Sequence, residues 1–398
     1  MKFFKSVFAM QPIRCMESQE TAKERSGNTP RSSKGRLAAK RNLKDKASFE
    51  PVSLFGALRG DSDPPSTVEP WSESESPSSC RHSEAEILDL ETCIEKVCDV
   101  KRWKEGRFQE VRLLQNAARN QGRVELMKEL STGKFVAVKR MPVSWTGLNH
   151  KDFQKKHPKE TEMPWLDIAM AKFLHGKGLP FACEVFGTYR DESETFFVSE
   201  FATKGDLFDW SQNGPTPGLE RENFLKPVVQ QLFTAMRILH SLNIAHLDLS
   251  LENTLLTERE DGSLQLKLID FGMTVVDQHR LAGARGKPSY QAPEMHDMPS
   301  FDPLIADTFS VGVVLFGMVG QDYPWLSTRP QGCKCFDFVR TKGLRAYFQK
   351  RKARNSNGAR LSEVLSEPLM DLLDGVLQVL PADRARLEQD FQWLRDDA

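Results

Sequence analysis

Three short motifs in the second half of the chain constrain its fold more than any other feature. The first, His246 to Asn253, holds Asp248 and Asn253 five residues apart. The second, Asp270-Phe271-Gly272, places another carboxylate on a tight glycine turn, and Ala292-Pro293-Glu294 follows it. One carboxylate can orient an attacking hydroxyl, while the amide and the second carboxylate can hold magnesium against the phosphates of a nucleotide. The order of these motifs therefore predicts phosphoryl transfer.

A lysine at a suitable distance upstream completes this set. In Val136-Ala137-Val138-Lys139, β-branched residues alternate as they do in strands and lead to a cation that can reach phosphates. With these residues the chain resembles the eukaryotic protein kinase family from about residue 105 to the C-terminus. The resemblance implies an α+β fold of two lobes with ATP between them. The N-lobe (105–201) would be a small, mostly antiparallel sheet with one main helix, and the C-lobe (202–398) would be larger and helical.

The resemblance also implies a role for each motif residue. Asp248 would be the catalytic base that accepts the proton of the substrate hydroxyl, and Lys139 would contact the α- and β-phosphates of ATP. Asn253 and Asp270 would bind the metal, Mg²⁺ or Mn²⁺. The catalytic loop and the segment before Glu294 resemble serine/threonine kinases rather than tyrosine kinases. We therefore expect serine and threonine hydroxyls of proteins to be the acceptors.

The loop that covers the phosphates departs most from the family. Counting back from Lys139 places Gly122 and Val124 on the last Gly and the Val of the family's G-x-G-x-x-G-x-V loop. Ala117 and Arg119 then stand where the first two glycines belong. Because glycines let backbone amides approach phosphates closely, we expect a stiffer loop. This loop, together with the order His-Leu-Asp-Leu-Ser in the catalytic loop, also resembles the divergent FIKK-type kinases more weakly.

The phosphate lysine needs an acidic partner on the next helix, and two alignments compete for that position. One alignment places Met170 there, whereas a loop longer by three residues places Asp167 there. We prefer Asp167, because an ammonium group without a carboxylate would be poorly held. Glu160 or Glu162 is a less favoured substitute.

The adenine would bind at the strand and hinge formed by residues 196–202. Ser199 falls at the gatekeeper position, and so small a side chain predicts an open pocket behind the adenine. The other residues implied to contact the nucleotide are Val124 and Ala137 above the ring, Leu255 below it, and the backbone groups of Glu200 and Ala202 at its edge.

Two departures concern the activation segment. Leu247 stands where the family has an arginine that pairs with a phosphate on this segment. Between Thr274 and Ser289 the segment contains no Ser, Thr or Tyr. We therefore predict activity that does not require phosphorylation of this stretch.

A second departure is paired. Ser250 replaces the lysine that the family usually has two residues after the catalytic aspartate, and Lys287 replaces the threonine of its Gly-Thr-Pro triplet. These two family positions lie against each other, so the cation and the hydroxyl have exchanged places. We expect Lys287 to supply positive charge at the transferred phosphate and Ser250 to supply a hydrogen bond. The alternative is that Lys287 only contacts substrate.

The substrate class is less constrained. Asp206 and Glu252 align with acidic residues that some kinases use to hold basic residues near the phosphoacceptor, although capping or solvation explains them equally well. An ATP-binding pseudokinase scaffold is the main alternative function, because two loop glycines are missing. Phosphorylation of a small molecule is less favoured. We expect protein substrates, no nucleic-acid partner and no membrane span.

The composition fits one catalytic domain with an N-terminal extension. The chain has 398 residues, zero formal net charge and seven irregularly spaced cysteines, which favour reduced thiols and an intracellular protein, cytoplasmic or nuclear. Residues 1–85 are basic and then acidic, rich in Ser and Pro, and predicted to be disordered. Residues 86–104 are predicted to be a helical lead-in, because Ile87, Leu90 and Ile94 recur at helical spacing.

Overall fold

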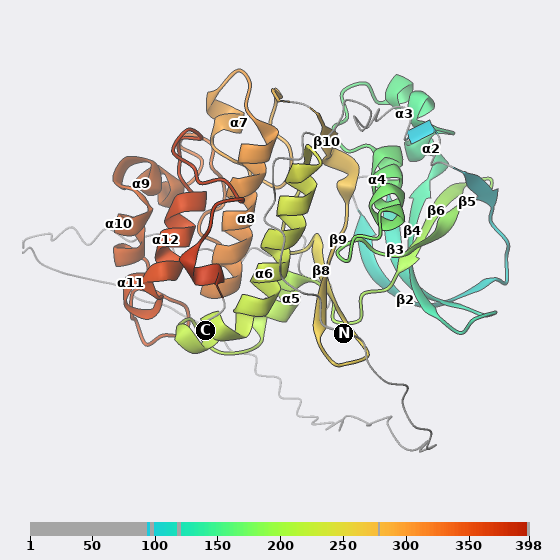
Figure 1. The fold of residues 1–398 in the computed structure, drawn as a ribbon. Helices are drawn as coiled ribbons and strands as arrows, with labels where there is room; N and C mark the ends of the chain where they lie inside the picture. Colours follow the sequence, from blue (N-terminus) through green and yellow to red (C-terminus); the bar gives the residue numbers. More distant parts are fainter. Residues whose placement is uncertain (1–93, 96–98, 118–120, 278, 396–398) are drawn as a thin grey trace, which may run out of the picture. The chain divides into compact units, whose positions relative to one another are not determined.

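A six-stranded sheet and the helix packed beside it make up the N-terminal part of the described chain (Figure 1). The computed structural model describes residues 94–95, 99–117, 121–277 and 279–395. The predicted disordered extension, residues 1–85, lies outside this range. The sheet has the order β1-β5-β6-β4-β3-β2 and consists of β1 (Val100–Arg102), β2 (Phe108–Ala117), β3 (Gly122–Glu129), β4 (Phe135–Pro142), β5 (Val185–Arg190) and β6 (Glu194–Glu200).

The sheet is mixed, because β1 pairs in parallel with β5 whereas the other neighbouring strands are antiparallel. The helix predicted for residues 86–104 therefore does not extend over Val100–Arg102. Ile94 and Glu95 are helical, and Asp99 belongs to no helix or strand. The other residues of 86–98 lie outside the described part of the chain. The strand forms because it supplies partners to the backbone edge of β5, and Trp103 beyond it stacks on Phe196 with ring centroids 4.0 Å apart.

Alternation along β4 separates a core face from a site face. Val136 and Val138 are buried in an apolar cluster with Phe196, whereas Ala137 and Lys139 are half-buried on the opposite face. The short helices α2 (Val143–Thr146) and α3 (His150–Lys156) follow β4. The pattern of the strand thus directs Lys139 away from the apolar cluster.

Helix α4 (Pro164–Gly176) is the main helix of this part. Proline at its first position is pre-organised for a helix start, and apolar side chains surround most of its circumference. Its buried residues include Trp165, Ile168 and Met170. A helix that is apolar nearly all round must be enclosed, and α4 contacts both β5 and the turn at Phe271–Met273.

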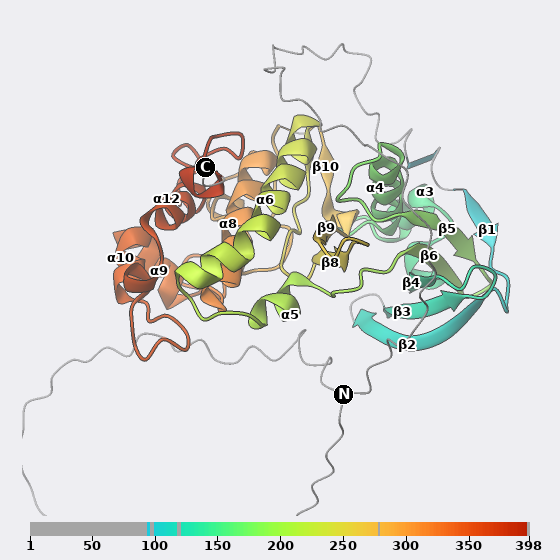
Figure 2. The ribbon, with the colours of Figure 1, turned by 60° about the horizontal axis from the view of Figure 1, so that its bottom comes forward.

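The C-terminal part is helical, with two small two-stranded sheets beside it (Figure 2). Its helices are α5 (Leu207–Gln212), α6 (Leu219–Ser241), α7 (Glu294–Asp297), α8 (Pro303–Gly320), α9 (Lys334–Lys342), α10 (Leu344–Lys350), α11 (Leu361–Val364) and α12 (Glu367–Val376), with 3₁₀ turns η2 (Phe271–Met273) and η3 (Gln392–Leu394). Its strands are β7 (Ile244–Ala245) paired with β10 (Val275–Val276), and β8 (Thr254–Glu258) paired with β9 (Leu264–Leu268). The expected α+β, two-lobed architecture is confirmed.

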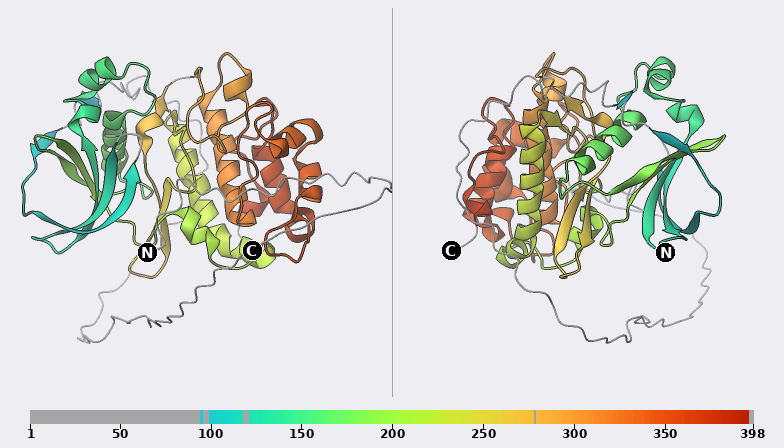
Figure 3. Two further views of the ribbon diagram at one scale, coloured as in Figure 1. Left: turned by 180° about the vertical axis from the view of Figure 1, so that it is seen from behind. Right: turned by 45° about the vertical axis from the view of Figure 1, so that its right-hand side comes forward.

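Helix α8 is the centre of the helical lobe and lies between α6 and α12 (Figure 3). It begins where the Asp302 side chain accepts hydrogen bonds from the amides of Leu304 and Ile305. Within the described residues it is the one helix long and apolar enough to cross a membrane, and 94% of it is buried inside the protein. A Cβ on Gly317 would lie 2.9 Å from Leu251 Cδ1, so this glycine lets the helix pack directly against the catalytic loop.

A buried ion pair ties the segment after the third motif to the end of the chain. Arg384 Nη2 lies 2.8 Å from Glu294 Oε2, and Arg384 Nη1 lies 2.5 Å from Oε1. Both side chains are almost fully buried. Arg384 also donates to the carbonyls of Ile305 and Gln378, which satisfies donors that burial would otherwise leave unpaired.

Candidate active site

Lys139 is held between two carboxylates. Its Nζ lies 2.7 Å from Asp167 Oδ2 and 3.2 Å from Asp270 Oδ1. Burial lowers the pKa of Lys139, but the charges of Asp167 and Asp270 outweigh burial and raise the pKa well above its usual range. The structure therefore places Asp167, and not Met170, against the lysine; Met170 is buried in the apolar core.

The same aspartate binds the turn that carries Asp270. The amide of Phe271 donates to Asp167 Oδ1 at 2.8 Å, and the amide of Met163 donates to the Gly272 carbonyl at 2.8 Å. Asp270 itself has a left-handed backbone with φ of 66°, which is costly for a non-glycine residue and is maintained by these contacts. The start of α4 and the Asp-Phe-Gly turn are thus positioned together.

Asp307 of α8 fixes the backbone at the start of the catalytic loop. Its carboxylate accepts the amides of His246, at 2.6 Å, and Leu247, at 2.8 Å. Leu247 has φ of 61°, a conformation that bulky residues rarely adopt without outside support. Leu247 is also buried, so its apolar side chain packs in the position where the family would place a cation.

Asp248 and Asn253 are in direct contact. Asn253 Nδ2 donates to the Asp248 carbonyl at 2.7 Å and to Asp248 Oδ2 at 3.0 Å. Burial raises the pKa of Asp248 to about 7, although Lys287 opposes the shift. Because the nitrogen of Asn253 is directed at Asp248, its amide oxygen is the atom available to a cation. That oxygen and the Asp270 carboxylate are the hard ligands that Mg²⁺ prefers, so the residues fit the metal.

Lys287, from the segment after the Asp-Phe-Gly turn, also contacts Ser250 of the catalytic loop. Lys287 Nζ donates to Ser250 Oγ at 2.6 Å and to Glu252 Oε2 at 2.9 Å. The neighbouring Gly286 has φ of 79°, and a Cβ there would lie 2.6 Å from the Leu247 carbonyl oxygen. Only glycine lets this segment approach the catalytic loop closely enough for the lysine to reach Ser250.

The comparisons with known proteins agree with this geometry. The family described as protein kinase domain matches residues 120–393. The chain belongs to the protein kinase family. This kinase is 28% identical over 284 residues to Serine/threonine-protein kinase SBK1 of Mus musculus, which covers 69% of this chain and 63% of that protein.

Two plant proteins are also similar to this kinase. CBL-interacting protein kinase 32 of Oryza sativa subsp. japonica is 31% identical over 218 residues, covering 52% of this chain and 47% of that protein. CBL-interacting serine/threonine-protein kinase 16 of Arabidopsis thaliana is 29% identical over 211 residues, covering 50% and 41%. The matched regions span less than two thirds of each relative. These relatives do not support the FIKK-type resemblance, which stays a prediction.

Three of the expected adenine-contacting residues, Val124, Ala137 and Ser199, lie on three neighbouring strands. Ala137 pairs with Ser199 across β4 and β6, and Val124 pairs with Lys139 across β3 and β4. Gly122 pairs with Ala117 as the last pair of β2 and β3; Arg119 lies outside the described residues. From the other lobe, Leu255 is half-buried in β8, whereas Glu200 and Ala202 lie at the hinge.

The activation segment of the kinase buries the two hydroxyl residues at its ends. Thr274 is 1% exposed and Ser289 is 4% exposed. Ser289 Oγ donates to the Leu326 carbonyl at 3.2 Å. Arg285 donates to the Met273 carbonyl at 3.2 Å. These contacts connect the segment to the Asp-Phe-Gly turn and to the residues before α9.

Two tyrosines close to Glu252 were not predicted from the sequence to belong to the site. Tyr323 donates to Glu252 Oε1 at 3.0 Å, and Tyr290 contacts Tyr323 through their hydroxyls at 3.2 Å. The Tyr290 hydroxyl also accepts the amide of Leu251 at 3.1 Å. No short-range pattern links these residues, which come together only because α8 returns the chain to the catalytic loop.

Asp206 caps α5 by accepting the amide of Asp209.

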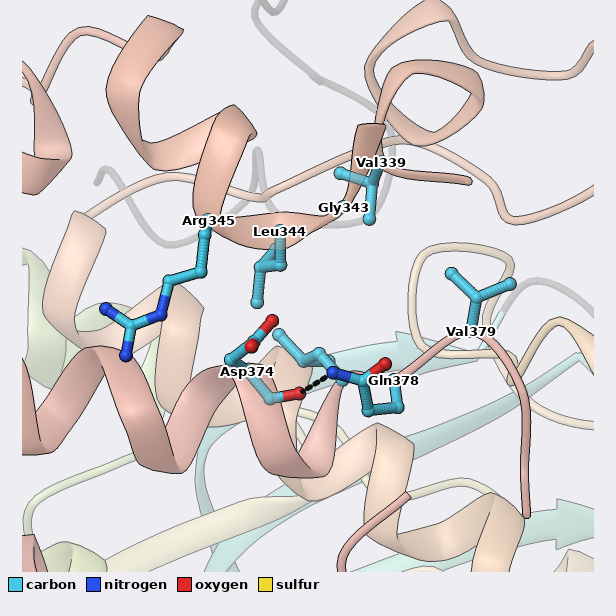
Figure 4. A pocket seen from close by; sticks show the side chains of 8 residues that line it. Val339, Gly343, Leu344, Arg345, Asp374, Gln378 and Val379 are labelled. Atoms are coloured by element: carbon cyan, nitrogen blue, oxygen red, sulfur yellow. Dashed lines mark hydrogen bonds between the residues drawn. The ribbon is translucent and has the colours of Figure 1, made fainter. Parts of the chain in front are cut away.

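A small cavity of about 180 Å³ lies outside this constellation (Figure 4). It is formed by Val339, Gly343, Leu344 and Arg345 around the α9–α10 junction and by Asp374, Leu377, Gln378 and Val379 around the end of α12. None of the predicted active-site residues lines it. We assign it no part in phosphoryl transfer.

Proposed function

We propose that this chain is a serine/threonine protein kinase that transfers the γ-phosphate of Mg-ATP to hydroxyls of protein substrates. The observation that carries the proposal is one constellation of five side chains: Lys139 bound to Asp167 and Asp270, and Asp248 bound to Asn253. A nucleotide-binding scaffold has no need of both groups of contacts. The pseudokinase alternative is for this reason less well supported.

Each residue of the constellation has a distinct task in this proposal. Lys139, kept charged by its two carboxylates, would hold the α- and β-phosphates. Asp248 would orient the substrate hydroxyl and accept its proton, and a carboxyl with a pKa of about 7 is well matched to that task near neutral pH. Asn253 and Asp270 would hold Mg²⁺, which neutralises charge on the phosphates when bound.

Lys287 would contribute the cation that the catalytic loop lacks. Its ammonium group lies 2.6 Å from Ser250 Oγ, so it occupies the neighbourhood that the family's catalytic-loop lysine would fill. Glu252 holds it there at 2.9 Å, and Tyr323 in turn binds Glu252. A positioned cation acts where negative charge is carried by the transferred phosphoryl group.

Lys287→Ala is expected to lower kcat about a hundredfold, the usual effect of losing one positioned charge at a transition state. The matched variant restores the family arrangement by combining Ser250→Lys with Lys287→Thr. It should recover most of the lost turnover. Full turnover by Lys287→Ala would contradict the exchange. Steady-state kinetics of the three proteins on one peptide decide it.

We also propose that the kinase needs no activation-segment phosphate. Leu247 cannot bind one, and the two flanking hydroxyls are buried. Chain produced in bacteria and shown by mass spectrometry to be unphosphorylated on residues 274–289 should phosphorylate serine or threonine peptides from the first minutes of the assay. A preparation that is inactive until Thr274 or Ser289 is modified would contradict this proposal. Separately, phosphate transfer to small alcohols but not to peptides would contradict the assignment as a protein kinase.

Substrate preference and location form the outer part of the proposal. Glu252 already binds Lys287 and Tyr323, and Asp206 caps α5. We therefore favour substrates selected without a requirement for basic residues near the phosphoacceptor over substrates selected for such residues. An intracellular location, cytoplasmic or nuclear, accords with the free thiols of Cys183, Cys333 and Cys335.

A further inference from the structure

Two cysteines at the start of α9 form a dithiol that the catalytic constellation does not use. Cys333 is the N-cap of α9 and Cys335 is in its first turn. Cys333 Sγ accepts the amide of Leu326 at 3.5 Å and a hydrogen bond from the Cys335 thiol. The two sulfurs are therefore neighbours, and neither is in a disulfide.

The environment of Cys333 favours its thiolate. The hydrogen bond from Cys335 lowers the pKa of Cys333 most; burial opposes the shift, and the amides of Leu326 and Phe336 add to it, so that the pKa is about 5. Tyr347 in α10 and Arg351, the C-cap of α10, are titratable groups that interact with the pair. Tyr347 is buried and donates to the Pro324 carbonyl at 2.7 Å, and its pKa is raised by burial, so it adds no negative charge.

Three hydrogen bonds join residues 325–328, whose Leu326 amide contacts Cys333, to the end of the activation segment. Leu326, whose amide binds the Cys333 sulfur, accepts the Ser289 hydroxyl through its carbonyl at 3.2 Å. The adjacent Trp325 donates its indole N–H to the Ser289 carbonyl at 3.0 Å. Thr328 donates to the Gln291 carbonyl at 2.8 Å. These contacts form a continuous connection from the Cys333 sulfur to the segment that follows Lys287.

We propose that Cys333 is a peroxide-reactive thiolate and that Cys335 resolves its sulfenic acid to a disulfide, which loosens the Ser289 segment. In the first step the Cys333 thiolate attacks a peroxide: an S–O bond forms, the O–O bond breaks, and the leaving oxygen takes a proton from solvent. In the second step Cys335 attacks the Cys333 sulfur: an S–S bond forms, the S–O bond breaks, and the hydroxyl leaves as water with the Cys335 proton. Two thiols lose two electrons, and hydrogen peroxide becomes two waters.

Oxidation would remove the acceptor that holds Leu326. A sulfur in a disulfide carries no charge and accepts a hydrogen bond only weakly, so the Leu326 amide would lose a charge-assisted partner. The Ser289 segment would then be less firmly placed, whereas the Lys139–Asp167 contact lies in the other lobe and would be unaffected. This consequence for activity rests on the proposed function, but the thiol chemistry itself does not.

Peptide-resolved alkylation of the full chain tests the thiolate directly. Cys183 is the matched control: it is 8% exposed, against 7% for Cys333, but burial raises its pKa to about 12. At pH 6.5, iodoacetamide should label Cys333 at least about tenfold faster than Cys183. Equal rates at the two residues would overturn the assignment of a reactive thiolate.

Hydrogen peroxide then tests the resolving step. In the wild-type chain, mass spectrometry should find a 333–335 disulfide, whereas Cys335→Ser should leave a Cys333 sulfenic acid that dimedone traps. Cys333→Ser places a residue that is favoured at N-caps at the start of α9, so it should retain basal activity and lose both products. The wild-type enzyme should show a peptide KM raised about tenfold after peroxide, with the KM for ATP unchanged, since a charge-assisted hydrogen bond is lost. Oxidation elsewhere with residues 333 and 335 still reduced would refute the proposal, even if the kinase is active.

Discussion

Asp167→Ala is expected to lower kcat at least about a hundredfold, because the lysine that positions the phosphates loses its closest carboxylate. Of the two carboxylates that bind it, Lys139 would keep Asp270, the residue that the metal also requires. The Phe271 amide would lose its acceptor at the same time. Both effects act on the arrangement of the phosphates and the metal rather than on the adenine. The loss should therefore appear mainly in kcat, measured with saturating peptide over a range of ATP concentrations.

Two further variants separate this assignment from its competitors. Met170→Leu conserves volume in the apolar core and should leave kcat unchanged. Glu162→Gln removes a carboxylate close to the Asp-Phe-Gly turn, where Glu162 Cγ would lie 3.3 Å from a Cβ on Gly272; its effect should be much smaller than that of Asp167→Ala. If Glu162→Gln abolishes turnover while Asp167→Ala retains it, the partner of Lys139 has been assigned to the wrong residue.

Arg221→Met is expected to cause the largest loss of stability, about 3–5 kcal/mol in the free energy of unfolding, because several buried acceptors lose their donor. Arg221 is fully buried and donates to the carbonyls of Met318, Ser211, Pro215 and Asn213. These carbonyls include the ends of α5 and α8, whose last carbonyls have no partner within the helix. One side chain thus binds the C-terminal ends of two helices that both contact Leu251 of the catalytic loop.

Urea unfolding followed by tryptophan fluorescence measures this loss as a shift in midpoint. The control is Arg395→Met, which removes an arginine whose ion pair with Asp390 is exposed on both sides; an exposed pair of this kind should give no measurable shift. Equal midpoints for Arg221→Met and the wild type would show that the buried network does not hold the helical lobe together.

The sequence anticipated those parts of the site that depend on short-range spacing. Asp248 and Asn253 share one loop, and Asp270 sits on a turn of its own, so their positions follow from the local chain and a few conserved geometric demands of phosphoryl transfer. The meeting of Ser250 with Lys287 could be inferred only through the family, because thirty-seven residues separate them. Asp167 was a choice between alignments that the geometry around Lys139 decides.

Other features depend on tertiary contacts that no local pattern records. The helical spacing of apolar residues predicted a helix for the lead-in, whereas Val100–Arg102 forms a strand that pairs with the edge of β5. The link from Glu252 through Tyr323 to Tyr290 forms between residues far apart in the chain. The contact of Cys333 with Leu326 likewise requires the turn before α9 to close on itself. Hydrogen bonds between residues this far apart in the chain cannot be inferred from local spacing.

The most direct test of the central claim is transfer of labelled phosphate from Mg-ATP to a mixture of serine and threonine peptides, comparing the wild type with Asp248→Asn. The amide can still accept the hydrogen bond from Asn253 but cannot take up the substrate proton, so turnover should fall about a thousandfold while ATP binding persists. Wild-type protein that binds ATP and transfers no more phosphate than Asp248→Asn would contradict the kinase assignment and favour a nucleotide-binding scaffold.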